Sequence, residues 1–277
     1  MFKIIDMESL APRIKRMSIE APNIARNAQA GQFIMIRLHD KGERTPLTLF
    51  KTDKENGVIE IVFQETGKST YELGNCQAGE QLLDVVGPLG KPTDIEEYGR
   101  VVVVAGGAGA PIGYAVAKAM HDAGNQVVGV VGFRNQEMVI LEDDLQAVCD
   151  DLIIATDDGS YGKHGFTSTV LQELIDTESG IDFVFTVGPV IMMKVIADIT
   201  KKHGIPTVAS LNPIMVDGMG MCGACRVCTK QGIKFACVDG PDFDAHEVNF
   251  NKLLSRLNEY DAEEQQSLER YLNNKDK

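Results

Sequence analysis

The 277-residue sequence predicts an antiparallel β-barrel followed by an α/β domain with a parallel sheet. Short β-rich segments separated by Gly, Asp and Asn fill the first third of the chain. From about residue 98 onwards, apolar strands alternate with helical segments, until a stretch rich in Cys and Gly interrupts that pattern. We therefore expect four regions, at residues 1–97, 98–212, 213–250 and 251–277.

The barrel prediction depends on short strand candidates at residues 32–38, 45–51 and 58–64. Their β-branched and aromatic residues favour strands. Evenly spaced short strands are typical of a small antiparallel barrel.

The α/β prediction begins at residues 101–105, a fully apolar segment that leads into a glycine loop and then an alanine-rich helix to about Ala123. Strands that alternate with helices indicate a parallel sheet with both faces covered. Residues 253–272 carry apolar side chains at helical spacing and predict a terminal amphipathic helix. Further strands are expected at 126–133, 152–155, 183–187 and 207–210, and helices at 168–175 and 191–203.

The chain is acidic, with a net charge of −13 from 27 Lys and Arg against 40 Asp and Glu. An acidic surface repels phosphate backbones, so we expect no nucleic-acid partner. The longest apolar runs are of strand length, which predicts no membrane span, and the N-terminus shows no signal peptide. We expect a cytoplasmic protein, in which six cysteines favour metal or redox chemistry over disulfides.

A glycine loop with Gly106, Gly107 and Gly109 follows the strand at 101–105. Glycines let a backbone approach a pyrophosphate closely, and the following helix N-terminus attracts anions. The next glycine is Gly113, so the spacing is not G-x-G-x-x-G, and a plain strand-to-helix turn is as good an explanation as a nucleotide site. The second strand ends in Arg134 and lacks the acidic residue that usually holds a ribose.

Two other loops carry polar residues at places where ligands bind. Asp157, Asp158 and Gly159 follow the third parallel strand, at the sheet edge where open α/β sheets bind ligands. Arg44 beside Thr48 in the barrel suits a diphosphate. Composition alone favours a solvated loop at the first place and an exposed strand end with an ordinary turn at the second.

The segment "VDGMGMCGACRVC" contains the strongest chemical signal. Asp217, Cys222, Cys225 and Cys237 have the spacing D-x4-C-x2-C-x11-C, whereas plant-type [2Fe–2S] ferredoxins use C-x4-C-x2-C with a distant fourth cysteine. Zinc is the alternative, because three cysteines and one aspartate can form a tetrahedral site. Cys228 offers a second spacing, C-x2-C-x2-C.

The order of barrel, dinucleotide domain and cysteine segment resembles the ferredoxin–NADP reductase superfamily. The stretches "TDDGSYGKHGF", "GPVIMMK", "SLNPIMVDGMGMCGACRV" and "KFACVDGPDFD" resemble the electron-transfer subunits of dihydroorotate dehydrogenase. They are most similar to the small (alpha) subunits of NADH-dependent ferredoxin:NADP oxidoreductase, also called sulfide dehydrogenase. That family is known for an aspartate ligand at the position of Asp217.

This resemblance implies a set of site residues. FAD would be held by Arg44, Pro46, Leu47 and Thr48, with its pyrophosphate at Gly67, Ser69 and Thr70. NAD(H) would bind at Gly106, Gly107 and Gly109, and Asp157, Asp158 and Gly159 would lie near the pyridine nucleotide or the flavin. The [2Fe–2S] ligands would be Asp217, Cys222, Cys225 and Cys237, with Cys228 a bystander. No catalytic side chain is expected, because the cofactors carry the chemistry.

The implied function is that of an oxidoreductase subunit which exchanges hydride between NAD(H) and FAD. Single electrons would pass to a larger flavin and iron–sulfur subunit of a heterodimer, in flavin-based electron bifurcation that indirectly involves ferredoxin and NADP(H). A dihydroorotate dehydrogenase subunit and a zinc-stabilised flavin-binding or regulatory module are the alternatives. Arg134 favours a 2′-phosphate, and therefore NADPH, whereas the resemblance favours NADH. The sequence also departs from the family at Ala110, Pro111 and Ile112, where Ile-Ala-Pro is usual.

Overall fold

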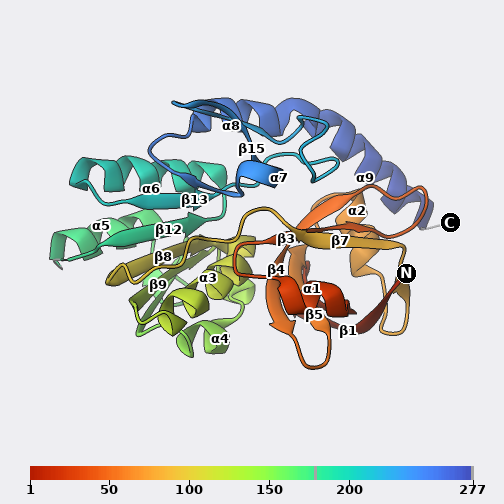
Figure 1. Ribbon diagram of the computed structural model, residues 1–277, viewed down its shortest axis with the longest axis horizontal. Coiled ribbons are helices and arrows are strands. Elements are labelled where there is room, and N and C mark those ends of the chain that lie inside the picture. Colours follow the sequence, from red (N-terminus) through yellow and green to blue (C-terminus); the bar gives the residue numbers. More distant parts are fainter. Residues whose placement is uncertain (178–179, 276–277) are drawn as a thin grey trace.

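The structure is a computed structural model that describes residues 1–177 and 180–275. Figure 1 shows the antiparallel strands on the right, the α/β part on the left and two C-terminal helices that cross above both. The predicted fold class is confirmed. No helix of the described ranges is long and apolar enough to cross a membrane.

The first sheet is antiparallel and nearly closes into a barrel, with strand order β6-β1-β2-β5-β4-β3-β7. The strands predicted within residues 32–64 are confirmed. β1 was not predicted, because only one of its ten side chains is buried and it lacks a clear apolar alternation. The elements are β1 (Phe2–Ala11), β2 (Ile14–Glu20), α1 (Pro22–Asn27), β3 (Phe33–Arg37), β4 (Thr45–Asp53), β5 (Val58–Gln64), α2 (Lys68–Gly74), β6 (Gln81–Leu82) and β7 (Asp84–Leu89).

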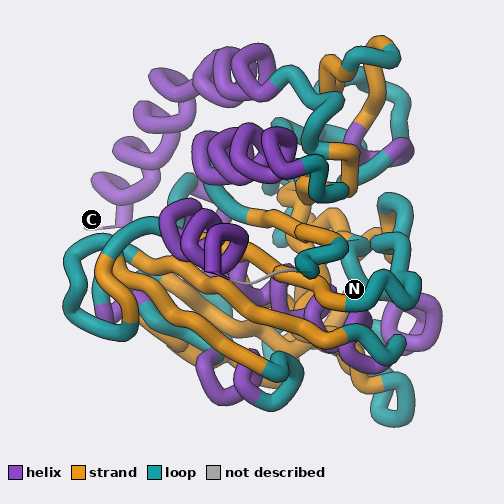
Figure 2. Tube along the Cα trace, turned by 90° about the vertical axis from the view of Figure 1, so that its left-hand side faces the viewer, coloured by secondary structure: helices purple, strands orange, loops and turns teal. Residues whose placement is uncertain are grey.

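The second sheet is parallel except at one edge, with order β11-β10-β9-β8-β12-β13-β16. Along β8 (Arg100–Gly106), Val101 and Val103 face the core under α3 (Ala110–Asp122), while Val102 and Val104 face the opposite core. Two-sided burial explains the continuous apolar run, and Figure 2 shows helices on both faces of these strands. The other elements are η1 (Gly107–Gly109), β9 (Gln126–Phe133), η2 (Gln136–Met138), α4 (Glu142–Gln146), β10 (Asp151–Thr156), β11 (Lys163–His164), α5 (Thr167–Thr177), β12 (Phe183–Val187), α6 (Val190–His203) and β13 (Thr207–Ser210).

The cysteine-rich segment folds as a small hairpin followed by a strand that joins the parallel sheet. The hairpin strands are β14 (Arg226–Thr229) and β15 (Gly232–Phe235). After the short helix α7 (Ala236–Asp239), β16 (Asp242–Asp244) pairs antiparallel with β13. The segment is therefore attached to the α/β sheet by backbone hydrogen bonds.

The prediction of one terminal helix over 253–272 is corrected to two helices, α8 (Phe250–Leu257) and α9 (Asp261–Lys275), separated by η3 (Asn258–Tyr260). Phe250 and Leu253 of α8 are buried, whereas the start of α9 is exposed. α9 instead reaches the barrel at α2, where Tyr271 Oη lies 3.1 Å from Asn75 Nδ2. The tail thus packs on its own chain.

The outer face of β4 joins the barrel to the α/β domain. Phe50 of β4 is buried, and its ring lies 4.9 Å from that of Tyr114 on α3. The Lys51 ammonium lies over both rings and 2.5 Å from an Asp144 carboxylate oxygen. An apolar contact with an ion pair at its rim therefore fixes one domain against the other.

We predict that Phe50→Ala lowers the free energy of unfolding by about 3–5 kcal/mol, because it empties this contact. Lys51→Ala should cost only about 0.2–1 kcal/mol, since the ion pair is partly exposed. Urea unfolding followed by circular dichroism measures both. Equal losses for the two variants would contradict the prediction.

Candidate functional site

The predicted flavin-binding strand lies where the barrel sheet opens. Residues 45–48 of β4 pair with β3, and pairing with β5 begins only at Leu49, with an irregularity between Leu49 and Lys51. Arg44, directly before β4, is exposed, while Pro46, Leu47 and Thr48 are half-buried. The side of the strand that turns away from β3 is therefore accessible beside the loop that follows β5.

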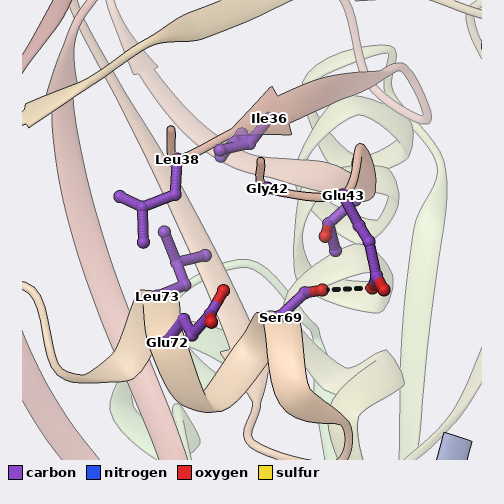
Figure 3. Close-up of a pocket in the computed structure, with 8 residues that line it drawn as sticks. Ile36, Leu38, Gly42, Glu43, Ser69, Glu72 and Leu73 are labelled. Carbon is purple, nitrogen blue, oxygen red and sulfur yellow. Dashed lines mark hydrogen bonds between the residues drawn. The ribbon is translucent and has the colours of Figure 1, made fainter. Parts of the chain in front are cut away.

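That loop contains the predicted pyrophosphate residues Gly67, Ser69 and Thr70. Thr70 Oγ1 accepts a hydrogen bond from the Gly67 amide at 3.1 Å and donates to the Gly67 carbonyl at 2.9 Å, so its hydroxyl caps α2. Ser69 donates to a Glu43 carboxylate oxygen at 2.5 Å, which Figure 3 shows at the edge of a small pocket. The sequence prediction missed Glu43, although it adjoins Arg44. The pocket is lined by Ile36, Leu38, Gly42, Glu43, Thr45, Ser69, Glu72 and Leu73.

The three glycines of the predicted nucleotide loop are required for different structural reasons. A Cβ added at Gly109 would lie 2.7 Å from the Val187 carbonyl oxygen, and one at Gly106 would lie 2.7 Å from Met192 Sδ. These two glycines allow β8, β12 and α6 to pack closely. Gly107 has φ +51°, and a Cβ there would meet no described atom within 4 Å. Its backbone is the part of the loop that faces open space, at the carboxyl end of β8.

The loop after β10 is held by its own hydrogen bonds. Asp158 accepts hydrogen bonds from the Ser160 hydroxyl at 2.6 Å and the Ser160 amide at 2.9 Å, and these bonds hold the pKa of Asp158 below its ordinary value. The Asp157 amide donates to the Phe133 carbonyl, which ties the loop to the end of β9. Gly159, with φ +73°, turns the chain between Asp158 and Ser160. Asp157 and Asp158 are both exposed at the ligand-binding edge of the sheet.

The predicted metal ligands come together as two pairs. Cys222 Sγ lies 3.4 Å from Asp217 Oδ1, and Cys225 Sγ lies 3.2 Å from Cys237 Sγ. The hairpin explains the long x11 spacing, because β14 and β15 return the chain to the start of β14 and bring Cys237 back to Cys225. Across residues 1–177 and 180–275, no three His, Cys, Asp or Glu side chains are arranged around one ion position.

The Asp217 carboxylate shapes the loop that carries it. Oδ1 accepts the Met219 amide at 3.1 Å, and Oδ2 accepts the amides of Met221 at 2.8 Å and Cys222 at 3.0 Å. These hydrogen bonds hold the pKa of Asp217 below its ordinary value, and the one from the Met219 amide has the largest effect. The Asp217 carboxylate is therefore an anion whose position is fixed by three backbone amides.

The second pair is buried. Cys225 and Cys237 are each 2% exposed, and burial, followed by the neighbouring Cys225 thiol, raises the pKa of Cys237 to about 12. Metal binding at Cys237 must therefore displace its proton. Side chains alternate along β14, so Val227 lies on the same buried face as Cys225, while Cys228 lies on the opposite face.

This donor set fits a [2Fe–2S] cluster, in which each iron takes two protein ligands. Three thiolates supply the soft donors that iron–sulfur clusters use, and the carboxylate supplies one oxygen. The Asp217–Cys222 pair would hold one iron near the surface, and the Cys225–Cys237 pair would hold the other in the core.

Comparisons with known proteins agree with this site. A family model, the iron–sulfur cluster binding domain of dihydroorotate dehydrogenase B, matches residues 212–249. The chain is 44% identical over 270 residues to a dihydroorotate dehydrogenase B (NAD(+)) electron transfer subunit homolog from Thermotoga maritima, covering 98% of this chain and 95% of that protein. It is 34% identical over 249 residues to the electron transfer subunit of that enzyme from Streptococcus pneumoniae, covering 87% and 97%.

A solved structure of NADH-dependent reduced ferredoxin–NADP oxidoreductase, described for flavin-based electron bifurcation, is also similar. It superposes with a TM-score of 0.92 at 42% sequence identity, covering 98% of this chain and 97% of that chain.

We predict that Gly109→Ala lowers the free energy of unfolding by about 1–3 kcal/mol, because the new methyl group meets backbone that cannot move aside. Gly67→Ala is the matched control, since φ there is −116° and a Cβ would meet no described atom within 4 Å. It should change stability by less than about 1 kcal/mol. Chemical denaturation of both variants would contradict the packing argument if the losses were equal.

Proposed function

The chain belongs to the family of dihydroorotate dehydrogenase B electron-transfer subunits, and from this premise we propose that it is a flavin and iron–sulfur oxidoreductase subunit. It binds FAD, a [2Fe–2S] cluster and NAD(H), and acts in a heterodimer with a larger subunit. The proposal depends most directly on the two donor pairs of the cysteine segment. This segment packs against the barrel that contains the predicted flavin-binding strand.

The nucleotide loop and the flavin-binding strand lie at the same domain junction. η1 contacts β5, and α3 packs on β4 through Tyr114 and Phe50. Residues 106–109 present their backbone and the positive N-terminal end of the 13-residue helix α3 to the NADH pyrophosphate. FAD, when bound, supplies the conversion between a hydride and single electrons. The protein's part is to hold both nucleotides at this junction.

The cluster loop suits the exchange of electrons with a second subunit. Cys222 is exposed, and the surrounding Val216, Met219 and Met221 are 53%, 54% and 84% exposed. An exposed apolar loop beside a cluster ligand is a surface that another protein chain can cover. We assign the larger subunit to this face.

The finer role that we propose is flavin-based electron bifurcation, in which NADPH oxidation drives the reduction of both ferredoxin and NAD. Two features support it. Asp217 replaces the first cysteine of the C-x4-C-x2-C-x11-C spacing of dihydroorotate-type subunits. The oxidoreductase structure, at 42% identity, also resembles this chain more closely than the pneumococcal dihydroorotate-type subunit does. The second candidate, a dihydroorotate dehydrogenase subunit, is favoured by the family model over residues 212–249.

Anaerobic purification followed by metal, sulfide and flavin analysis tests the cofactor proposal. We expect about two irons and two sulfides per chain, one FAD, and an S = 1/2 EPR signal after dithionite reduction. Zinc without iron, in protein never exposed to air, would overturn it in favour of a zinc-stabilised module. The co-purifying large subunit separates the finer roles, since a complex that oxidises dihydroorotate would support the second candidate.

We predict that Asp217→Cys lowers the midpoint potential of the cluster, because a thiolate donates more electron density to iron than a carboxylate does. Redox titration monitored by EPR measures the shift. Cys228→Ser is the matched control and should leave the potential unchanged, since Cys228 faces away from the ligand pairs. An equal or higher potential in Asp217→Cys would refute the oxygen-ligand assignment.

A further inference from the structure

Strand β3 is buried on both faces. Ile34 and Ile36 point into the barrel core, while Phe33 and Met35 belong to a separate core built with α6, β13 and the cysteine segment. Met35 is only 2% exposed. The outer face of β3 is therefore the surface on which the cluster segment rests.

Gly218, the residue after Asp217, packs against this surface. Gly218 has φ +75°, and a Cβ there would lie 2.7 Å from Met35 Cγ and 3.2 Å from Leu89 Cδ1. The backbone of the loop thus lies directly against the Met35 side chain, in a space that admits no methyl group. Both the conformation and the contact require glycine.

A shift at Gly218 would be transmitted to the ligand. The Asp217 carboxylate accepts the amides of Met219, Met221 and Cys222, so residues 217–222 form one hydrogen-bonded turn. A turn held at both ends by one carboxylate moves as a unit when its contact surface moves.

Met35 also lies beside the flavin-binding strand. It is the register partner of Pro46 on β4, and Ile34 is the partner of Leu47. One residue of β3 therefore separates the predicted flavin-binding strand from the loop that bears the oxygen ligand.

We propose that Met35 is a positioning residue, which fixes the Asp217 loop relative to the flavin-binding strand through its contact with Gly218. The inference rests on the proposed function, because it assigns to Met35 the placing of a cluster ligand. Met35 does not touch the reacting groups; it sets where the ligand loop stands, and with it the environment of the cluster.

Gly218→Ala tests the contact, and Gly223→Ala is its matched control. Gly223 lies in the same loop with φ +69°, but a Cβ there would meet only Phe235 Cε1 at an ordinary 3.6 Å. Both variants carry the cost of a positive φ, and only the first collides with Met35. The double variant Met35→Ala/Gly218→Ala restores the space, and Ile34→Ala empties the opposite face of β3 as a control for general destabilisation.

The first readout is the EPR spectrum of the reduced cluster together with its midpoint potential. We expect both to shift in Gly218→Ala, to remain as in the unaltered protein in Gly223→Ala and Ile34→Ala, and to return towards the original values in the double variant. If Gly218→Ala does not fold, Met35→Leu is the alternative test. It nearly conserves the side-chain volume but changes its shape, so the protein should fold and the EPR spectrum should still shift. Indistinguishable spectra for Gly218→Ala and Gly223→Ala, or no recovery in the double variant, would overturn the proposal.

The second readout needs no cluster. Amide hydrogen exchange at Met219, Met221 and Cys222 should be at least about tenfold faster in Gly218→Ala than in Gly223→Ala, because the Asp217 turn loses its support. Equal exchange rates would overturn the positioning role even in a protein free of iron. Absence of iron from the unaltered protein would instead refute the proposed function, so the two failures are distinguishable.

Discussion

The two-sided burial of strand β3 is the constraint on which the arrangement of the molecule depends. Its inner face closes the barrel, and its outer face belongs to the core that contains Cys225 and Cys237. The same core includes residues of α6 and β13 from the α/β domain. Because three parts of the chain share this packing, none of them can shift independently of the others. This packing fixes the positions of the predicted flavin-binding strand, the Asp217 loop and the parallel sheet relative to one another.

The domain junction at β4 completes this relation from the other side of the barrel. Phe50 and Val62 point away from the barrel interior and join the core under α3. The predicted nucleotide loop that leads into α3 is therefore held against the barrel by apolar packing. A protein that transfers electrons between bound groups benefits from such rigidity, because its function depends on fixed distances more than on side-chain chemistry.

Much of the fold was predictable because burial on one or both faces leaves a pattern in the sequence. The run at 101–105 is apolar throughout because α3 covers one face of β8 and α5 and α6 cover the other. β1 left no such pattern, since only one of its ten side chains is buried. The break between α8 and α9 escaped prediction because the apolar spacing continues weakly past Leu257, whereas the packing of the tail on this core comes from α8, through buried Phe250 and Leu253 and partly buried Leu254 and Leu257. Spacing suggested the ligand set at 217–237, but the pairing needed the hairpin, and the role of Gly218 needed Met35, which is 183 residues away in the chain (218 − 35).

The aspartate at 217 has a structural consequence that a cysteine could not reproduce. Two carboxylate oxygens accept three backbone amides, whereas a thiol is a weak acceptor with a single sulfur. The Asp217 carboxylate therefore shapes the loop that carries it. Cys237 differs from Asp217 in this respect, since burial raises the pKa of its thiol and metal binding there displaces a proton. The proposed cluster site thus combines a hydrogen-bonded carboxylate near the surface with two enclosed cysteines in the core. The carboxylate half is also the half whose loop packs on Met35, so the proposed positioning by the barrel acts through Asp217.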